Sequence, residues 1–498
     1  MLLLAMVSHQ PRPYQARALD ELRENVKARI KRQLLVAPTG AGKTTIAALM
    51  IQGAVAKKKR IGFLAHRREL ISQASKRLDG QGIDHGIIQA NHWRTRPDLP
   101  VQVISVPTLT RRLHRKPPLD LIIIDEAHRS MAAGYQKIVD AYPEAVVIGL
   151  TATPWRLDGR PLGKFYQDLV LASKPSELIA DGWLMQPRVF APFVPDVSGL
   201  KTTRGDFDPR DLDALMNNAQ LVGDVVHHWR ILVHARGGSG LSVVFAVNVQ
   251  HSRALAAKFC EAGVAAAHLD ADTPAADRDR ILVDMHEGRI QVVCNCMILT
   301  EGWDLPALNA VILARPTASV ALFLQMVGRV MRPHPGKTEA LVIDHAASTL
   351  RHGFAHTDRE YVLTTQERKK KTKDEGPALT VCPECFTIFP SADLGCPTCG
   401  WVKPKPKQKI REAEGNLSEL DPSKVSVKPW TQISQTDQVH AFAELKAKQR
   451  TRGFKDLWSC LQFKERLGFW PSKPVQAAGE ARAERLIAER ARPAGRVF

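Results

Sequence analysis

Short apolar runs punctuate the first two thirds of the chain and alternate with stretches of helical periodicity. The first series of runs is Leu34–Val36, Ile61–Ala65, Val101–Val106, Leu121–Ile124 and Val146–Leu150. Runs that are apolar at every position and separated by helices are typical of a parallel sheet buried on both faces. The pattern predicts an α/β lobe over residues 1–195, in which Trp155–Phe193 contributes helices and loops.

A second series of apolar runs follows a polar stretch, Pro195–Asp211, which contains Gly and Pro. The series is Val243–Val247, Ala265–Leu269, Val292–Cys296, Val311–Ala314 and Leu341–Ile343. Because these runs have the same length and character as the first series, they predict a second α/β lobe, which we place at residues 212–365.

The last part of the chain is polar and basic. A charge run at Glu367–Gly376 predicts a solvated linker, and a segment with four Cys follows at residues 378–402. A stiff basic linker, Lys403–Lys407, leads to a basic C-terminal region at residues 425–498. The aromatic residues of that region are Trp430, Phe442, Phe454, Trp458, Phe463, Phe469 and Trp470. They suit either a small helical core with a basic outer face or a surface on which bases stack.

Composition narrows the class of protein. The net charge of the 498 residues is +19, which indicates a polyanionic partner. From Gln366 onward there are 25 Lys and Arg against 16 Asp and Glu, so the tail is more basic than the lobes. Eight Cys in so long a chain do not form a disulfide framework, and the apolar start lacks the charged n-region of a signal peptide. We expect a cytoplasmic protein with reduced thiols and no membrane partner.

The segment Ala37–Thr44 lies where an apolar run ends and helical periodicity begins. The backbone of such a loop and the positive end of the helix dipole face a bound phosphate. The loop residues are Thr39, Gly40, Ala41 and Gly42. Lys43 then reaches the outer phosphates, and the Thr44 hydroxyl holds Mg²⁺. Although Ala37 stands where the strict pattern has Gly, the sequence predicts a nucleoside triphosphate site in the first lobe.

Two adjacent carboxylates follow the apolar run that ends at Ile124. At the carboxyl end of a buried parallel strand, Asp125 and Glu126 face the crevice in which ligands of α/β sheets bind. Asp125 is expected to hold Mg²⁺, and Glu126 is expected to take a proton from an attacking water.

Gln15 precedes an amphipathic stretch near the start of the chain. Its amide offers the donor and the acceptor that an adenine edge requires. A polar residue at the start of a helix is also a common cap, so both interpretations stay open.

In the second lobe, Gln325, Arg329 and Arg332 recur at helical spacing. Residues three and four apart share one helix face, so the three side chains are expected to line one surface. Across a cleft between the lobes they would meet the γ-phosphate, which is the role of an arginine finger.

The four Cys of the tail form two Cys-x-x-Cys pairs, Cys382 with Cys385 and Cys396 with Cys399. Two such pairs in so short a segment are typical of a tetrahedral Zn²⁺ site, and a closed shell of four thiolates indicates a structural zinc.

Together these motifs resemble those of a superfamily 2 helicase with a DEAH-type box, over about residues 10–350. The similarity extends to Ala65–Leu70, Thr108-Leu109 and Thr151–Pro154. It implies two tandem RecA-like lobes that bind ATP and Mg²⁺ between them. The further roles that it implies are backbone contacts to nucleic acid for Arg68 and Thr108, coupling of the two sites for Thr151 and Thr153, and a nucleotide-coupling loop with Gly302 and Asp304.

The order of helicase lobes, four-Cys knuckle and basic tail is similar to that of the bacterial and phage RadD-type DNA repair helicases, as is Phe463–Gly468 before Trp470. This similarity implies DNA rather than RNA, and Thr153–Arg156 also resembles the DNA motors of restriction enzymes. We therefore expect an ATP-dependent DNA helicase or translocase of DNA repair or phage DNA metabolism, with repair or replication proteins as further partners of the tail. The alternatives are an ATP-gated DNA remodeller that does not unwind strands and the motor subunit of a restriction system.

Overall fold

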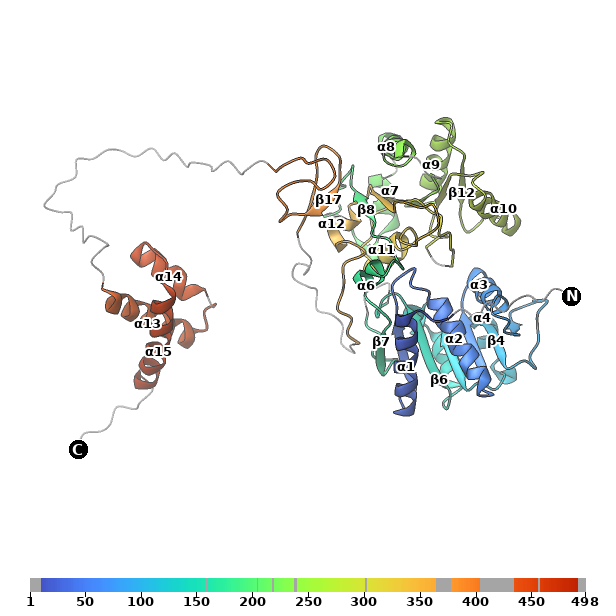
Figure 1. Cartoon of the computed structure of the whole chain (residues 1–498), viewed down its shortest axis with the longest axis horizontal. Helices are drawn as coiled ribbons and strands as arrows, with labels where there is room; N and C mark the ends of the chain where they lie inside the picture. Colours follow the sequence, from blue (N-terminus) through green and yellow to red (C-terminus); the bar gives the residue numbers. More distant parts are fainter. Residues whose placement is uncertain are drawn as a thin grey trace. The chain divides into compact units, whose positions relative to one another are not determined.

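The computed structural model describes residues 10–156, 160–203, 205–216, 219–236, 240–300, 302–363, 378–403, 434–455 and 457–490. The chain divides into two compact units, Met1–Lys405 and Pro406–Phe498, which we describe separately (Figure 1). The predicted linker Glu367–Gly376, most of Lys403–Lys407 and Trp430 lie outside the described residues. Within the described ranges, no helix is both long and apolar enough to cross a bilayer.

The first lobe is built on a seven-stranded parallel sheet of order β3-β4-β2-β5-β6-β1-β7. Its strands are β1 (Arg32–Val36), β2 (Ile61–Ala65), β3 (Gly86–Ile88), β4 (Val101–Ser105), β5 (Leu121–Ile124), β6 (Val146–Thr151) and β7 (Asp168–Leu171). Its helices are α1 (Pro13–Lys27), α2 (Lys43–Ala56), α3 (Arg68–Asp79), α4 (Val106–Arg111) and α5 (Ala133–Asp140). Because all the strands are parallel, their carboxyl ends share one edge of the sheet.

The core of the first lobe follows the two-residue period of the strands. Leu35 and Phe63 pack in the layer that contains α1, α2 and α3, whereas Leu34 and Leu64 pack on the other face with α4 and α5. Figure 1 shows α1 and α2 lying along one face of the sheet. Both faces are therefore covered, which is why the strands are apolar at nearly every position.

The second lobe is built on a six-stranded sheet of order β12-β13-β11-β14-β15-β8, in which every pairing is parallel. Its strands are β8 (Arg188–Phe190), β11 (Ser242–Ala246), β12 (Ala266–Leu269), β13 (Val292–Asn295), β14 (Ala310–Ala314) and β15 (Leu341–Asp344). The helices after β7 are α6 (Pro175–Ala180), α7 (Pro209–Met216), α8 (Ala219–Leu232), α9 (Val249–Glu261), α10 (Ala275–His286), α11 (Val320–Val327) and α12 (Ser348–His352). A short hairpin of β9 (Thr202–Thr203) and β10 (Asp206–Phe207) precedes α7.

The strand β8 belongs to the second sheet, although it precedes the boundary that the sequence predicted. The sequence placed residues 188–190 in the first lobe, but Val189 pairs with Val342 of β15 in the second sheet. The chain therefore crosses between the sheets after α6 rather than at residue 195, and Trp155–Phe193 contributes two strands as well as helix and loop. Both strands are short, and each begins with a charged residue, Asp168 and Arg188.

The four-Cys segment belongs to the first compact unit and lies against the second lobe. It contains an antiparallel hairpin of β16 (Leu379–Val381) and β17 (Ile388–Pro390). Next to this hairpin, Thr387 forms a bridge with Phe190 of β8, and the Ala191 amide donates to the carbonyl of Phe386 at 2.8 Å. We call residues 378–403 the ribbon; it extends the β8 edge of the second sheet.

The second unit is helical within the described residues: α13 (Gln435–Arg452), α14 (Trp458–Leu467) and α15 (Lys473–Arg490). Phe442 and Phe463 meet edge to face with 5.8 Å between ring centroids and form its core with Val475. Gly479 lets α15 approach, since a Cβ there would lie 2.7 Å from the Phe442 ring. Phe454 and Trp470 remain partly exposed, so the aromatic residues divide between core and surface.

Candidate functional site

The loop between β1 and α2 has the backbone of a phosphate cradle. Gly40 and Gly42 have φ of 92° and 77°, values that L side chains rarely adopt, and Gly42 is the N-cap of α2. The buried Ala41 faces away from the cavity, and its carbonyl accepts a hydrogen bond from the Tyr14 hydroxyl at 2.6 Å. This hydrogen bond holds the loop in place on its buried side. The free N–H groups at the N-terminus of α2 are on the opposite side, where a phosphate can bind.

Charged groups of both lobes surround Lys43. Its ammonium donates to the carbonyl of Ala37 at 3.3 Å. Burial lowers the pKa of Lys43; Glu126 and Asp125 oppose this shift, whereas Arg332 and Arg329 add to it. Two carboxylates of the first lobe and two arginines of the second are therefore close enough to act on one lysine.

Asp125 and Glu126 follow β5, which pairs with β6 near the middle of the sheet. Glu126 has φ of 50°, its amide donates to Oδ1 of Asp125 at 3.0 Å, and both residues line the cleft. Nε2 of Gln325 lies 3.4 Å from Oε2 of the largely buried Glu126, and Nδ1 of His128 lies 3.3 Å from the same oxygen. The carboxylate of Glu126 thus contacts the opposite lobe directly.

The structure gives Arg329 and Arg332 different hydrogen-bond partners. The helix predicted to carry both ends at Val327, because Gly328 is its C-cap and turns follow. The buried guanidinium of Arg329 donates to the carbonyls of Thr300 and Trp303 in its own lobe. Arg332 instead pairs with Asp304, and both side chains line the cleft. The two residues therefore do not lie on one helix as the spacing predicted, although both line one cavity.

The lobes touch at two glycines of the second lobe. A Cβ at Gly328 would lie 2.3 Å from Cβ of Thr39 in the phosphate loop, which only glycine avoids. At Gly302, which has φ of 68°, the carbonyl accepts from the amide of Gln73 on α3. The phosphate loop and α3 of the first lobe thus contact the loops that carry Arg332 and Asp304.

Between the lobes lies a cavity of about 1070 Å³. The predicted residues that line it are Gln15, Thr39, Gly40, Gly42, Lys43, Thr44, Asp125, Glu126, Gly302, Asp304, Arg329 and Arg332. Residues that the sequence did not single out also line it: Arg12, Gln73, Lys76, Arg77, Trp183, Asp279 and His286. The volume is ample for a nucleotide.

Arg12 and Trp183 form a pair that sequence reasoning missed. The Arg12 guanidinium lies 4.1 Å from the centroid of the Trp183 ring, and both residues line the cleft. Gln15 is nearby, but its Oε1 accepts from the Arg12 amide at 3.1 Å and caps α1. Arg12 lies close to Gln15 in the sequence, so it could have been noticed there. Trp183 lies about 170 residues further along the chain, so no local spacing could have suggested its contact with Arg12.

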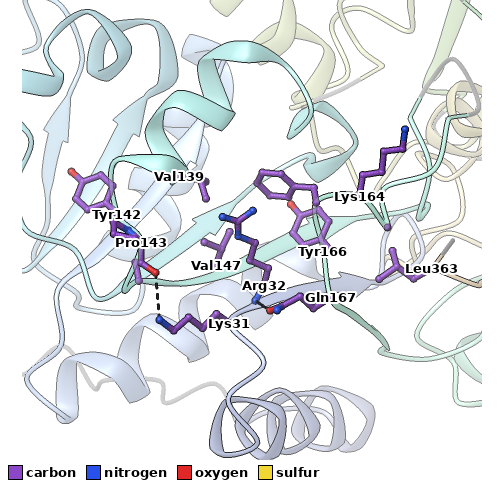
Figure 2. A pocket seen from close by; sticks show the side chains of 13 residues that line it. Lys31, Arg32, Val139, Tyr142, Pro143, Val147, Lys164, Tyr166, Gln167 and Leu363 are labelled. Carbon is purple, nitrogen blue, oxygen red and sulfur yellow. Dashed lines mark hydrogen bonds between the residues drawn. The ribbon is translucent and has the colours of Figure 1, made fainter. Parts of the chain in front are cut away.

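A second cavity, of about 510 Å³, lies at the amino-terminal ends of the strands of the first lobe's sheet (Figure 2). Among its lining residues are Arg32, the first residue of β1, and Val147, the second residue of β6. Lys31 closes one side and donates to the carbonyl of Pro143 at 3.4 Å. No predicted site residue lines this cavity, so it is separate from the nucleotide cleft.

The residues predicted to meet nucleic acid or to couple the sites lie at the carboxyl edge of the first sheet. Arg68 is exposed at the start of α3, after β2, and Thr108 lies on α4, after β4. Thr151 and Thr153 are buried, and the Thr151 hydroxyl donates to the carbonyl of Thr153 at 2.8 Å. The carbonyl of Thr151 also accepts from the amide of Ala37, which ties this turn to the phosphate loop.

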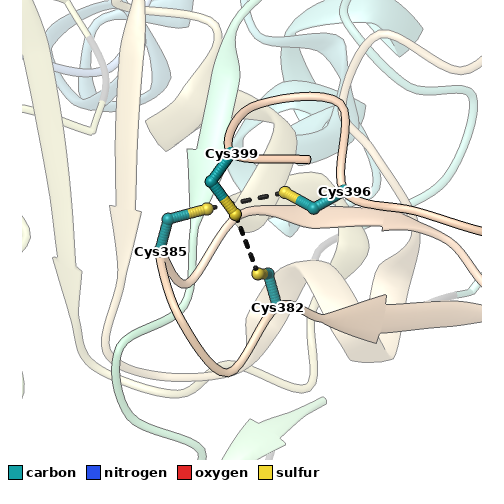
Figure 3. A group of neighbouring side chains, drawn as sticks. All are labelled: Cys382, Cys385, Cys396 and Cys399. Atoms are coloured by element: carbon teal, nitrogen blue, oxygen red, sulfur yellow. Dashed lines mark hydrogen bonds between the residues drawn. The ribbon is translucent and has the colours of Figure 1, made fainter. Parts of the chain in front are cut away.

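The ribbon brings its four Cys together (Figure 3). The sulfurs of Cys382 and Cys399 lie 3.5 Å apart, as do those of Cys385 and Cys396, and all four lie within 4.8 Å of one another. A tetrahedron with Zn–S bonds of about 2.3 Å has S–S edges of roughly 3.8 Å. The donor set and spacing therefore fit a zinc ion.

Two family models match the chain. Residues 8–156 match the model described as "Type III restriction enzyme, res subunit", and residues 227–334 match "Helicase conserved C-terminal domain". The chain belongs to the superfamily 2 helicases and is an ATP-dependent enzyme of that class. The two sheets confirm the predicted fold of tandem RecA-like lobes.

Among its relatives, a 51.5 kDa protein of a Lactococcus phage is 32% identical over 79% of this chain and 84% of its own length. A Saccharomyces cerevisiae protein named as the ATP-dependent helicase IRC3 is 33% identical over 67% of this chain. The match covers 51% of that protein, so this chain spans about half of its length. The fold is similar to a fragment of a type I restriction enzyme HsdR subunit from Vibrio vulnificus, with a TM-score of 0.56, 22% identity, and coverage of 70% of this chain and 67% of that one.

Proposed function

We propose that the protein is a DNA translocase or helicase in which ATP binds between the lobes and draws them together on a single strand. The observation that carries this proposal is the composition of the cleft. Lys43 and Glu126 of the first lobe face Arg332 of the second across one cavity. A site assembled from two lobes changes when they move, so hydrolysis and movement are linked.

Each charged residue of the cleft has a role in this proposal. The loop N–H groups and Lys43 bind the phosphates, and Glu126 accepts the proton of the attacking water. Thr44 and Asp125 would hold Mg²⁺, which neutralises charge that develops on the phosphates. Arg332 stabilises the γ-phosphate from the other lobe, while Arg329 holds the loop that carries Asp304.

Two further parts belong to the proposal. The first is structural Zn²⁺ in the ribbon, supported by the sulfur spacing. The second is a role in DNA repair or phage DNA metabolism, with DNA as the bound polyanion. This part is supported by the net charge of +19, by the match to a restriction-enzyme family model and by the RadD-like order of domains. An ATP-gated remodeller or a restriction motor would use the same cleft.

Two substitutions in the cleft test this proposal. Glu126→Gln keeps the shape of the side chain but removes the base, so turnover falls about 10²-fold or more while ATP still binds. The lobes then stay closed, and the variant binds single-stranded DNA more tightly with ATP than without it. Lys43→Ala removes a phosphate contact made in both ground and transition states, so binding and hydrolysis fall together.

Steady-state ATPase assays with and without single-stranded DNA or RNA, together with strand-displacement and triplex-displacement assays, separate the candidates. Stimulation by DNA with triplex displacement supports a translocase, and strand displacement identifies a helicase. Nucleotide-dependent DNA binding without either displacement identifies the remodeller. Equal hydrolysis with and without any polynucleotide would overturn the motor, and strict dependence on RNA would overturn DNA as the substrate.

A further inference from the structure

An exposed tryptophan stands on a loop of the first lobe that neither the motifs nor the nucleotide cleft include. Trp93 is 85% exposed, the highest value among the large exposed apolar side chains of the described residues. It lies five residues beyond the end of β3. Trp rarely projects so far into solvent without a partner, because its ring is the largest apolar surface of any side chain.

The topology places this loop in line with the candidate nucleic-acid contacts. The strands β3, β4 and β2 are consecutive neighbours at one end of the sheet. Trp93, Thr108 and Arg68 each follow the carboxyl end of one of these strands. Neighbouring strands lie about 4.8 Å apart, so the ends of these three strands span roughly 10 Å. The strands β5, β6 and β1, which serve the nucleotide cleft, continue the same edge.

An ion pair and hydrogen bonds hold this loop in place. Arg94 pairs with Asp79 at the end of α3 at 2.7 Å, and the carbonyl of Arg94 accepts from the amide of Ile87 in β3 at 2.9 Å. The Thr95 hydroxyl donates to the carbonyl of His92 at 2.7 Å. An aromatic ring presented on an ordered loop loses little conformational entropy when it binds.

The charges around Trp93 suit a polyanion. The Arg94 guanidinium lies 5.9 Å from the Trp93 ring centroid, and the His92 ring stacks beside it at 5.8 Å. Burial lowers the pKa of His92, and Arg68 and Arg94 lower it further, which puts Arg68 within electrostatic range of the loop. Arg94 and Arg96 pair with Asp79 and Asp98, and Arg68 is an exposed cation near the loop that a phosphate can reach.

We propose that Trp93 stacks on an unpaired base of the strand whose backbone phosphates Arg68 contacts. The proposal rests on the proposed function, because it needs a single strand along this edge. Every base has a π face, so the contact is insensitive to sequence, as a translocating protein requires. A duplex end that met the ring would present its terminal base pair to the same surface.

The test compares two variants by the binding of a fluorescent single-stranded oligonucleotide, measured by anisotropy across a salt series with a non-hydrolysable ATP analogue. Trp93→Ala weakens binding about 10-fold, the usual effect of removing one stacking aromatic, with an unchanged slope of log affinity against log salt. Arg68→Ala also weakens binding but reduces that slope by about one ion. Basal hydrolysis without DNA stays unchanged in Trp93→Ala, because the ring lies outside the cleft.

Controls separate stacking from mere loss of apolar surface. Trp93→Phe retains most of the affinity, and Val26→Ala, which trims another exposed apolar residue of the first lobe, has no effect. An abasic strand binds the wild type and Trp93→Ala equally. If the wild type binds DNA and Trp93→Ala binds the normal strand just as well, the stacking proposal is wrong; if the wild type binds no polynucleotide at all, the proposed function fails instead.

Discussion

At the scale of single residues, the division of roles between Arg329 and Arg332 matters most. Both belong to one motif in the sequence, and both lie beyond Gly328, the glycine that ends α11. Both arginines line the cleft and act on Lys43, but Arg329 also donates to two backbone carbonyls of its own lobe, whereas Arg332 pairs with Asp304. We propose that Arg329 mainly supports the coupling loop and that Arg332 supplies the charge for the reaction.

We predict that Arg332→Ala lowers kcat by about 10³-fold, within the range of arginine fingers, with little change in thermal stability. Arg329→Ala leaves two buried carbonyls without a donor, so it lowers the free energy of unfolding by roughly 2 kcal/mol. Steady-state ATPase assays and denaturant unfolding measure the two effects. Arg332→Lys serves as the control, because it keeps the charge but loses the planar fork. A fully stable Arg329→Ala variant with the larger loss of kcat would reverse the roles.

At the scale of elements, the ribbon is joined to the second lobe. Its backbone meets β8 at Thr387 and Phe386, and the ring of Phe386 lies 5.6 Å from that of His228 on α8. His228 in turn lies 5.2 Å from the buried His345, which follows β15. The four-Cys cluster is therefore joined by packing to the outer strand of the sheet rather than to the tail alone.

We predict that replacing Cys382 and Cys385 by Ser removes zinc and loosens β8 and α8 along with the ribbon, because a structural metal supplies local folding energy. Metal analysis gives the zinc content, and hydrogen exchange measured by mass spectrometry should rise at residues 188–190 and 219–232. ATP affinity should hold, since no ribbon residue lines the cleft. Cys260→Ser, at an exposed Cys outside the cluster, is the matched control. Unchanged exchange at β8 in a zinc-free variant would contradict this coupling.

Most central strands were predictable, and so was the edge strand β12, but the edge strands β3, β7 and β8 were not. Continuous apolar runs marked β1, β2 and β5, because central strands are buried on both faces. The edge strand β3 has three residues and includes Gly86, whose missing Cβ leaves room for the carbonyl of Arg96. Such a strand leaves no pattern, and so the loop that carries Trp93 was not recognised.

The candidate site likewise contains local motifs that were predictable and contacts between the lobes that were not. Local motifs identified Lys43 and Glu126, because phosphate loops and acidic strand ends are short patterns. Contacts between the lobes, such as Thr39 with Gly328, join positions almost 300 residues apart and cannot be read from spacing. The same holds for the positions of Arg329 and Arg332 beyond α11, which depend on where that helix ends.

At the scale of the whole molecule, the second unit is a separate helical body. From Pro406 onward the sequence contains 18 Lys and Arg against 11 Asp and Glu. Its core of Phe442, Phe463 and Val475 is internal to the unit. A body with its own core and a basic composition suits an accessory binding role rather than a part in hydrolysis.

We predict that a chain ending at Lys405 keeps its basal ATPase activity within about 2-fold, because compact units with their own cores fold independently. Its affinity for DNA should fall, with a shallower dependence on salt, since basic side chains have been removed. Filter binding across a salt series and ATPase titrations with DNA measure this. The Glu126→Gln substitution in the truncated chain is the control for residual hydrolysis. Loss of basal activity on truncation would contradict the separation of the units.

The pairing of β8 with β15 also affects how the chain is made. Val189 leaves the ribosome about 150 residues before Val342, its neighbour in the sheet. Translation proceeds at roughly 5–20 residues per second, so this strand waits on the order of 10 s for its partner. The first sheet is complete by Leu171 and can fold in that interval, but the second cannot close its outer edge. The nascent chain therefore carries a finished phosphate loop before the arginine that faces it has been synthesised.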